Sequence, residues 1–211
     1  MTKTFSLAGL AVAVLALALS DVVNRGYDPL TETVSRYVNQ PHGWLVTVGL
    51  LAVAVGSAAV AVRAGGSGWG GWLLHFWAGC VLVAAVFPAD PPGNWSRPSL
   101  SDGVHGVAAW AGFLALAIAI VRLTSVWRRE PAWASKACGL TVLAWASSAA
   151  FVLFAVAFVD KAVLTHTAPL GLAERVVIAL DLAWLALAAT SARSWAAISD
   201  ATGRAATGNV K

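Results

Sequence analysis

An aspartate in the middle of an apolar segment has the chemistry that most needs explaining in this sequence. Asp181 lies in the run Ala-Leu-Asp-Leu-Ala-Trp, near the centre of a segment long enough to cross a bilayer as a helix. An ionised carboxylate at that depth costs ~2.5–3.5 kcal/mol on insertion scales, so a partner, water or a bound proton must offset the cost. Asp181 is therefore either a neutral acid bonded to a hydroxyl on another helix, such as Ser147 or Ser148, or a residue that binds or reacts.

Glu174 extends this acidic pattern toward one end of the same segment. It precedes Asp181 by seven residues, which is two helical turns, so both carboxyls lie on nearly the same face. Trp184 follows Asp181 by three residues, on a neighbouring face one turn further along. Because a protonated acid in an apolar pocket can donate its proton to a substrate, Glu174 and Asp181 are predicted to be catalytic.

Asp90 and His105 form a second pair suited to proton transfer. Two prolines bracket Asp90 and stiffen the exit from one apolar segment, while His105 lies near the start of the next. We expect the two side chains to face each other, with the carboxylate orienting the imidazole for proton transfer or forming a static ion pair. A metal site would need further ligands, and His42 or Asp102 would supply them only if the loops folded inward. Neither a metal nor another cofactor is predicted.

The residues predicted to bind substrate are of two kinds. Arginines on the same side of the membrane as Asp90, His105 and Glu174 can bind phosphate or carboxylate through paired N–H donors. Alternatively, they neutralise the acids around them and bind no ligand. Tryptophans inside the segments can wall a cavity and stabilise cations, or they can pack between helices. These residues are Arg36, Arg97, Arg175, Trp77, Trp110, Trp145 and Trp184. By contrast Asp21 and Arg25, four residues apart, are expected to pair within one helix.

Composition indicates which elements must position these side chains. The chain is 59% hydrophobic and 11% charged, whereas soluble domains carry roughly 25% charged residues. The apolar residues fall in blocks that can span a bilayer, and each must be helical because an open strand would leave backbone groups unpaired in lipid. The predicted fold class is an all-α polytopic bundle of about six spans, a single domain over residues 1–193 with a polar tail at 194–211. The predicted spans are about 4–24, 43–63, 72–88, 103–123, 135–158 and 173–193, with a glycine-rich turn at 65–71.

Loop charges predict the orientation of this bundle. Most Lys and Arg residues outside the spans fall on the side of the N-terminus and the tail, which the positive-inside rule places in the cytoplasm. Most acids fall on the opposite, outer side. The net charge of +4 does not indicate nucleic acid, because the basic residues are scattered rather than clustered on one face. We expect a multi-pass protein of the cell membrane whose partners are membrane lipids and a hydrophobic small molecule.

Short motifs in a fixed order resemble one known family. They are Gly26-Tyr27-Asp28-Pro29-Leu30 with Val34-Ser35-Arg36-Tyr37, Gly43-Trp44, Phe87-Pro88-Ala89-Asp90-Pro91, Asp102-Gly103-Val104-His105 and Gly171-Leu172-Ala173-Glu174-Arg175. Over about residues 5–193 they resemble the family called domain of unknown function 998. The resemblance implies a six-helix membrane fold but supplies no reaction. It marks Ser35, Tyr37, Asp90, His105, Glu174 and Arg175, and on that basis Tyr37 joins the predicted substrate-binding residues.

Two functions remain open at this point. The first is an enzyme with an outward-facing acidic and aromatic pocket that performs acid–base chemistry, such as cyclisation or isomerisation, on a lipid-like or isoprenoid substrate. The alternative is a non-catalytic lipid or small-molecule binder, transport accessory or scaffold. An apolar cavity that reaches Asp181 favours the first, and a polar network satisfied internally without a cavity favours the second. The sequence carries no P-loop, G-x-S-x-G or H-E-x-x-H motif that would name a reaction.

Overall fold

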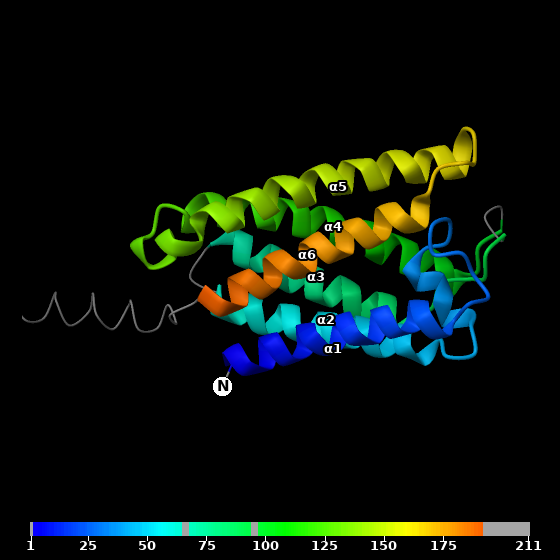
Figure 1. The fold of residues 1–211 in the computed structure, drawn as a ribbon, viewed down its shortest axis with the longest axis horizontal. Helices are drawn as coiled ribbons and strands as arrows, with labels where there is room; N and C mark the ends of the chain where they lie inside the picture. Colours follow the sequence, from blue (N-terminus) through cyan, green and yellow to red (C-terminus); the bar gives the residue numbers. More distant parts are fainter. Residues whose placement is uncertain (1, 65–67, 94–96, 192–211) are drawn as a thin grey trace, which may run out of the picture.

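The fold is an antiparallel bundle of long helices, seen in a computed structural model that describes residues 2–64, 68–93 and 97–191 (Figure 1). Within these ranges every regular element is a helix, which confirms the predicted all-α class. The long helices are α1 (Thr2–Val23), α2 (Trp44–Arg63), α3 (Trp69–Val86), α4 (Leu100–Trp127), α5 (Ala137–Val163) and α6 (Leu170–Ser191). Two short 3-10 helices, η1 (Val34–Asn39) and η2 (Pro131–Lys136), lie between them. The predicted tail at 194–211 lies outside the described residues.

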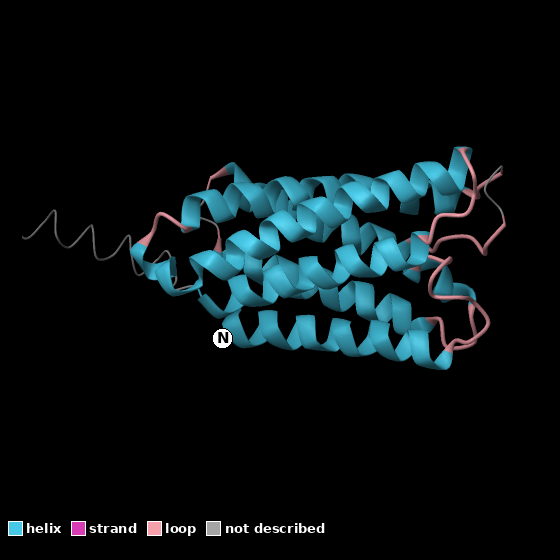
Figure 2. Ribbon diagram, turned by 45° about the horizontal axis from the view of Figure 1, so that its top comes forward, coloured by secondary structure: helices cyan, strands magenta, loops and turns pink. Residues whose placement is uncertain are grey.

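The six long helices form a closed ring. Each packs against the next in the chain, and α6 packs against α1 as well as α5. The connections gather at the two ends of the bundle (Figure 2). We call the end that holds η1 and the loops before α4 and α6 the η1 end, and the opposite end the η2 end. The first and last described residues both lie at the η2 end (Figure 1).

Five helices are long and apolar enough to cross a membrane: α1, α2, α3, α4 and, with η2, α5. The sixth, α6, is not among these five, and it carries three charged side chains, Glu174, Arg175 and Asp181. It nevertheless lies beside α1 and α5 within the ring, and it covers most of the sixth span predicted at about 173–193. The charged residues of α6 are therefore held by protein contacts rather than by water alone.

Local sequence explains where the helices around the cavity begin and end. Ser99 caps α4, because its hydroxyl accepts a hydrogen bond from the backbone N–H of Asp102. Pro88 lies just beyond the end of α3 and cannot donate a backbone N–H, so that helix stops at Val86. At the other end of α3, Gly68 has a positive φ of 65° and directly precedes the helix. The sequence predicted a glycine-rich turn up to residue 71, but α3 already begins at Trp69.

Small residues allow the helices to approach closely. A Cβ atom added at Gly9 of α1 would lie 3.0 Å from the Cα of Gly56 and 3.1 Å from the carbonyl oxygen of Ala52, both in α2. Association in a bilayer depends on such packing, because lipid offers no hydrophobic driving force between helices.

Three tryptophan rings stack on one another at the η2 end of the bundle. The ring of Trp127 lies 4.2 Å from that of Trp133 and 5.6 Å from that of Trp184, with all three nearly parallel. The indole N–H of Trp184 donates to the hydroxyl of Thr124 at 3.0 Å. Trp184 is fully buried in this stack, which joins η2, α4 and α6.

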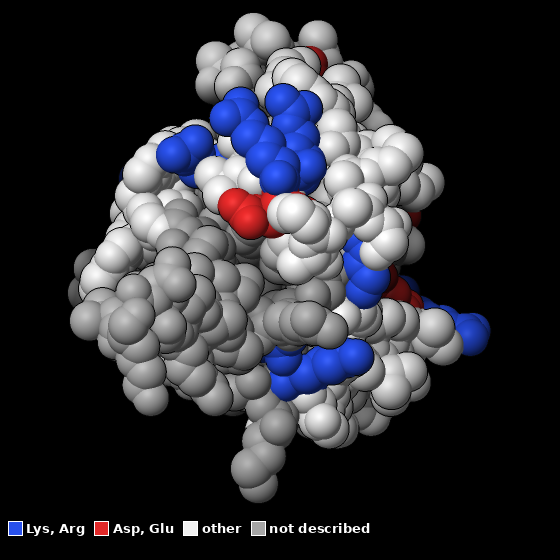
Figure 3. All heavy atoms as spheres, turned by 90° about the vertical axis from the view of Figure 1, so that its left-hand side faces the viewer, with Lys and Arg blue, Asp and Glu red and all other residues white. Residues whose placement is uncertain are grey.

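The η2 end also carries much of the positive charge. Lys and Arg side chains form several patches on its described surface, with few acids among them (Figure 3). Arg122, Arg128 and Arg129 are exposed there.

The close contact between α1 and α2 can be tested with two glycine substitutions. Gly9→Leu is expected to lower the free energy of unfolding by about 1–3 kcal/mol, because the added side chain meets backbone atoms that cannot move aside. The control is Gly79→Leu on α3, where a Cβ would meet nothing within 4 Å. Detergent-titration unfolding in bicelles measures both, and equal stability of the two variants would contradict the packing described.

Candidate functional site

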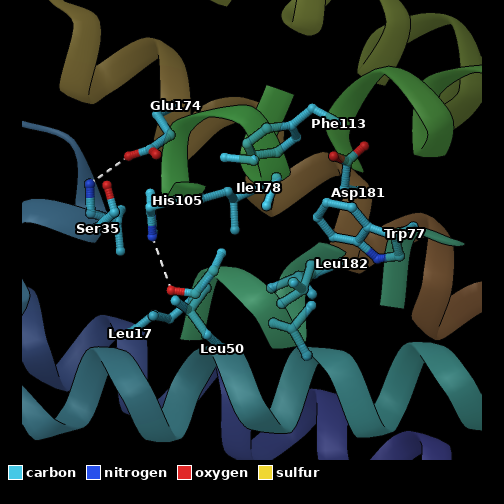
Figure 4. A pocket seen from close by; sticks show the side chains of 16 residues that line it. Leu17, Ser35, Leu50, Trp77, His105, Phe113, Glu174, Ile178, Asp181 and Leu182 are labelled. Atoms are coloured by element: carbon cyan, nitrogen blue, oxygen red, sulfur yellow. Dashed lines mark hydrogen bonds between the residues drawn. The ribbon is translucent and has the colours of Figure 1, made fainter. Parts of the chain in front are cut away.

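A largely apolar cavity, made of two adjoining chambers that share part of their walls, lies between the helices toward the η1 end. The deep chamber, of about 60 Å³, lies in the middle of the bundle, and Figure 4 shows its lining. The vestibule, of about 270 Å³, lies nearer the η1 end. Five residues line both chambers and therefore mark their junction: Ser35, His105, Ala109, Phe113 and Glu174.

His105 lies at this junction with a fixed ring orientation. Its Nδ1 atom lies 2.9 Å from the carbonyl oxygen of Ala84 and 2.9 Å from that of Phe87. The Ala84 carbonyl would accept from the residue four positions later in a continuing helix, but that residue is Pro88, which has no N–H. Because both neighbours are acceptors, we assign the proton to Nδ1. In a neutral ring Nε2 is then a proton acceptor.

Glu174 faces His105 from the first turns of α6. Its Oε2 atom accepts a short hydrogen bond from the backbone N–H of Val34, the first residue of η1 (Figure 4). The Glu174 side chain therefore holds η1 against α6 while it lines both chambers. Both Glu174 and His105 are only 7% exposed.

Asp181 lines the deep chamber and is 4% exposed. Its Oδ1 atom accepts a hydrogen bond from the hydroxyl of Ser147 on α5. Ser148 instead donates to the Ala144 carbonyl of its own helix. In the described part of the chain no basic side chain forms a salt bridge with Asp181. The carboxyl thus has both features foreseen as alternatives, a hydroxyl partner on another helix and a place on a cavity wall.

Aromatic rings form much of the remaining wall. In the deep chamber Trp77 donates its indole N–H to Ser57 at 3.0 Å and packs against Phe113 at 5.5 Å between ring centroids. In the vestibule Trp110 stacks on Phe154 at 5.2 Å, and the ring of Phe158 lies 4.9 Å from it.

The other two predicted wall tryptophans lie elsewhere. Trp145 is 71% exposed on the outside of the bundle, and Trp184 belongs to the stack at the η2 end. Neither lines either chamber. Of the four tryptophans predicted to bind substrate, Trp77 and Trp110 therefore line a chamber and the other two do not.

The predicted arginines are placed in three different ways. Arg36 lines the vestibule, and its Nη1 atom donates to the carbonyl oxygens of Asp90 and Pro91 at 2.9 and 2.8 Å. Arg97 is exposed and lines neither chamber. Arg175 points away from the cavity and makes a paired ionic contact with Asp21, at 2.9 Å from Nε and 2.6 Å from Nη2. Asp21 therefore pairs with α6 rather than with Arg25, which lies just beyond the end of α1.

Arg175 also fixes the chain between α1 and η1. Its Nη1 atom donates to three backbone carbonyls, those of Pro29, Glu32 and Gly171. Its guanidinium group lies 5.1 Å from the ring centroid of Tyr37, which is itself fully buried and donates its hydroxyl to the Tyr27 carbonyl at 3.0 Å. Burial raises the pKa of the Tyr37 phenol above its ordinary value of 10.0. Tyr37 thus supports the walls of the site and lines neither chamber.

Asp90 organises a loop at the η1 end. Its carboxylate accepts from the backbone N–H and the hydroxyl of Ser99, both at 2.7 Å, and its own N–H donates to the Asp102 carboxylate at 2.9 Å. It lines neither chamber. His105 is therefore oriented by two carbonyls instead of by Asp90.

Among the described residues no group of three or more His, Cys, Asp or Glu side chains is arranged to hold a metal ion.

The Ser147 contact predicts a clear difference between two neighbouring serines. Ser147→Ala is expected to destabilise the protein by about 1–3 kcal/mol, because it leaves the buried Asp181 carboxyl without its hydrogen bond. Ser148→Ala, which removes only a contact within its own helix, is expected to change stability by less than about 0.5 kcal/mol. Detergent-titration unfolding compares the variants, and a larger effect at Ser148 would contradict the assignment.

The partner of Asp21 can be identified with a double-mutant cycle. Asp21→Asn and Arg175→Met are expected to show a coupling energy of about 1–2 kcal/mol, typical of a hydrogen-bonded ion pair that is partly exposed. The matched cycle of Asp21→Asn with Arg25→Met should give a coupling near zero, since the Arg25 side chain donates to the Val22 carbonyl. Coupling to Arg25 instead would restore the pairing expected from the sequence.

A family described as "Protein of unknown function (DUF998)" matches residues 7–191. No curated protein and no solved structure matches the chain.

Proposed function

The chain belongs to the DUF998 family of proteins of unknown function, and we propose that it binds a lipid-like molecule in its cavity and performs acid–base chemistry on it. One observation carries this proposal: a single apolar cavity brings together an imidazole and two carboxyls, those of His105, Glu174 and Asp181. Apolar pockets with a few converging polar groups are the usual form of small-molecule sites.

The closed end of the cavity supports binding or catalysis over conduction. Beyond the deep chamber, toward the η2 end, the bundle is filled by side chains such as Leu116, Ile120, Leu140 and Leu185, all completely buried. In the described part of the chain these side chains fill the way from the cavity to the η2 end. This arrangement suits a substrate and its product better than an ion that crosses the membrane.

The chamber volumes limit what can bind. The vestibule, at about 270 Å³, is close to the lower end of small-molecule sites, roughly 300 Å³. The deep chamber, at about 60 Å³, has room for a few water molecules or a small reacting group. The ligand is then an amphipathic molecule whose reactive end reaches the junction at His105 and Glu174.

The proposed chemistry is a proton shift. His105 accepts a proton at Nε2 from one carbon of the substrate, and the Asp181 carboxylic acid gives a proton to another. The electron pair of the broken C–H bond forms the new double bond, and the old double bond forms the new C–H bond. The proton returns from His105 to Asp181 through water in the chambers. Because no atom is gained or lost overall, an isomerisation of this kind needs no co-substrate. Trp77 and Phe113 flank the reacting end, and their faces stabilise positive charge.

A non-catalytic binder is the second candidate, and a specific observation favours it. Each carboxyl already has a protein partner, Val34 for Glu174 and Ser147 for Asp181. Groups held in this way can shape a binding site for a lipid-like molecule without taking part in a reaction.

We also propose that the protein resides in the cell membrane with its η1 end outside. The support is the exposed Arg122, Arg128 and Arg129 at the η2 end, because the positive-inside rule places such residues in the cytoplasm. The cavity would then open toward the outer leaflet.

Deuterium incorporation tests the catalytic proposal without a known substrate. The purified protein in nanodiscs is incubated in D₂O with the lipid extract of its own source cells, and each lipid is analysed by mass spectrometry. The unsubstituted protein is expected to add deuterium to one lipid class at least 100-fold faster than Asp181→Asn or His105→Gln, as is usual when an acid or base is lost. Asparagine keeps the oxygen that accepts from Ser147 but has no acidic proton.

Glu130→Gln, at the opposite end of the bundle, is the control and should incorporate deuterium at the unsubstituted rate. If no lipid gains deuterium over the Asp181→Asn background, the catalytic proposal is wrong and the binding candidate replaces it.

A further inference from the structure

A groove on the membrane face of the bundle adjoins the cavity. It lies between α3 and α4, has a volume of about 690 Å³ and is lined almost entirely by apolar side chains. Phe76, Val83, Leu100 and Val107 are exposed in it, so they face lipid when the bundle is in a bilayer. A lipid chain can therefore occupy this groove without contacting water.

The groove and the cavity share part of their walls. Pro98 and Gly103 line both the groove and the vestibule, and Ala108 lines both the groove and the deep chamber. The wall shared by the groove and the cavity thus includes Pro98, just before α4, and the small residues Gly103 and Ala108 within α4.

Gly103 contributes no side chain to this shared wall. A Cβ atom added there would meet nothing within 4 Å, and the same holds for Gly106, which lines the vestibule one turn later. A glycine inside a helix lowers helix stability relative to alanine, and neither position needs glycine for its backbone angles. Open space beside two helical glycines is what a passage into the vestibule requires.

We propose that the ligand enters laterally from the bilayer through the α3/α4 groove, over Gly103. This inference rests on the proposed function and names its substrate class as an amphipathic molecule dissolved in the membrane. The apolar chain stays in the groove, while the polar or reactive end reaches His105 and Glu174. The chain never has to leave lipid, and so avoids the unfavourable hydration of its methylene groups.

Photocrosslinking in nanodiscs tests the route. The probe is hexadecanol with a diazirine beside its hydroxyl group, and peptide mass spectrometry maps the adducts. In the unsubstituted protein we expect adducts on groove residues such as Val107 and on junction residues such as Phe113. Gly103→Leu should reduce the junction adducts at least tenfold and leave adducts elsewhere on the membrane face unchanged. Gly79→Leu is the matched control, since Gly79 is an exposed helical glycine that lines neither groove nor cavity, and it should behave like the unsubstituted protein.

The outcomes separate this inference from the function on which it rests. If the unsubstituted protein gives no junction adducts, the proposed function fails and the route falls with it. If junction adducts form equally in Gly103→Leu, the ligand reaches the cavity by another path and only the lateral route is overturned. Should Gly103→Leu not insert, Gly103→Cys in a background with alanine at positions 80 and 138 can be folded first and then blocked with a bulky maleimide. The same tenfold loss on blocking is expected, and no loss would overturn the route.

Discussion

A polar group enclosed by membrane helices must find its hydrogen-bond partner within the protein, and the arrangement of the cavity follows from this constraint. Pro88 leaves the Ala84 carbonyl without a backbone donor, and the His105 ring supplies one from α4. The first backbone N–H of η1 meets the Glu174 carboxyl, and the Ser147 hydroxyl meets Asp181. Each contact joins segments distant in sequence, so satisfying the polar groups also fixes the helices around them.

The first turns of α6 divide two roles between adjacent residues. Glu174 points inward to η1 and the cavity, whereas Arg175 points outward to Asp21 and to the loop that precedes η1. The Arg175 contacts hold the connection between α1 and η1 in one conformation, and that connection in turn presents Ser35 and Arg36 to the chambers. Stability and site geometry at the η1 end therefore depend on the same pair of residues.

The sequence was sufficient to predict where the helices lie in the chain, but not which side of each helix packs against a neighbouring helix. Long apolar blocks mark the helices because a bilayer requires them, and Asp181 is conspicuous because a charge there is costly. Which side of each helix faces a neighbour is not written in hydropathy, since lipid and protein interior are both apolar. Trp145, on the outside, and Trp77, in the cavity wall, therefore look alike in sequence. The partnership of Asp21 and Arg175 was missed for a related reason: local spacing favoured Arg25, and nothing in a single sequence links residues so far apart.

The central claim is that one apolar cavity unites His105, Glu174 and Asp181 and holds a lipid-like molecule. An experimental structure of the protein in a lipid environment, at a resolution that reveals bound molecules, tests it most directly. The account predicts elongated density in the vestibule, ending within hydrogen-bond distance of Nε2 of His105 and continuous with the deep chamber. Side chains that fill the junction, or chambers occupied by water alone in the presence of source-cell lipids, would contradict it.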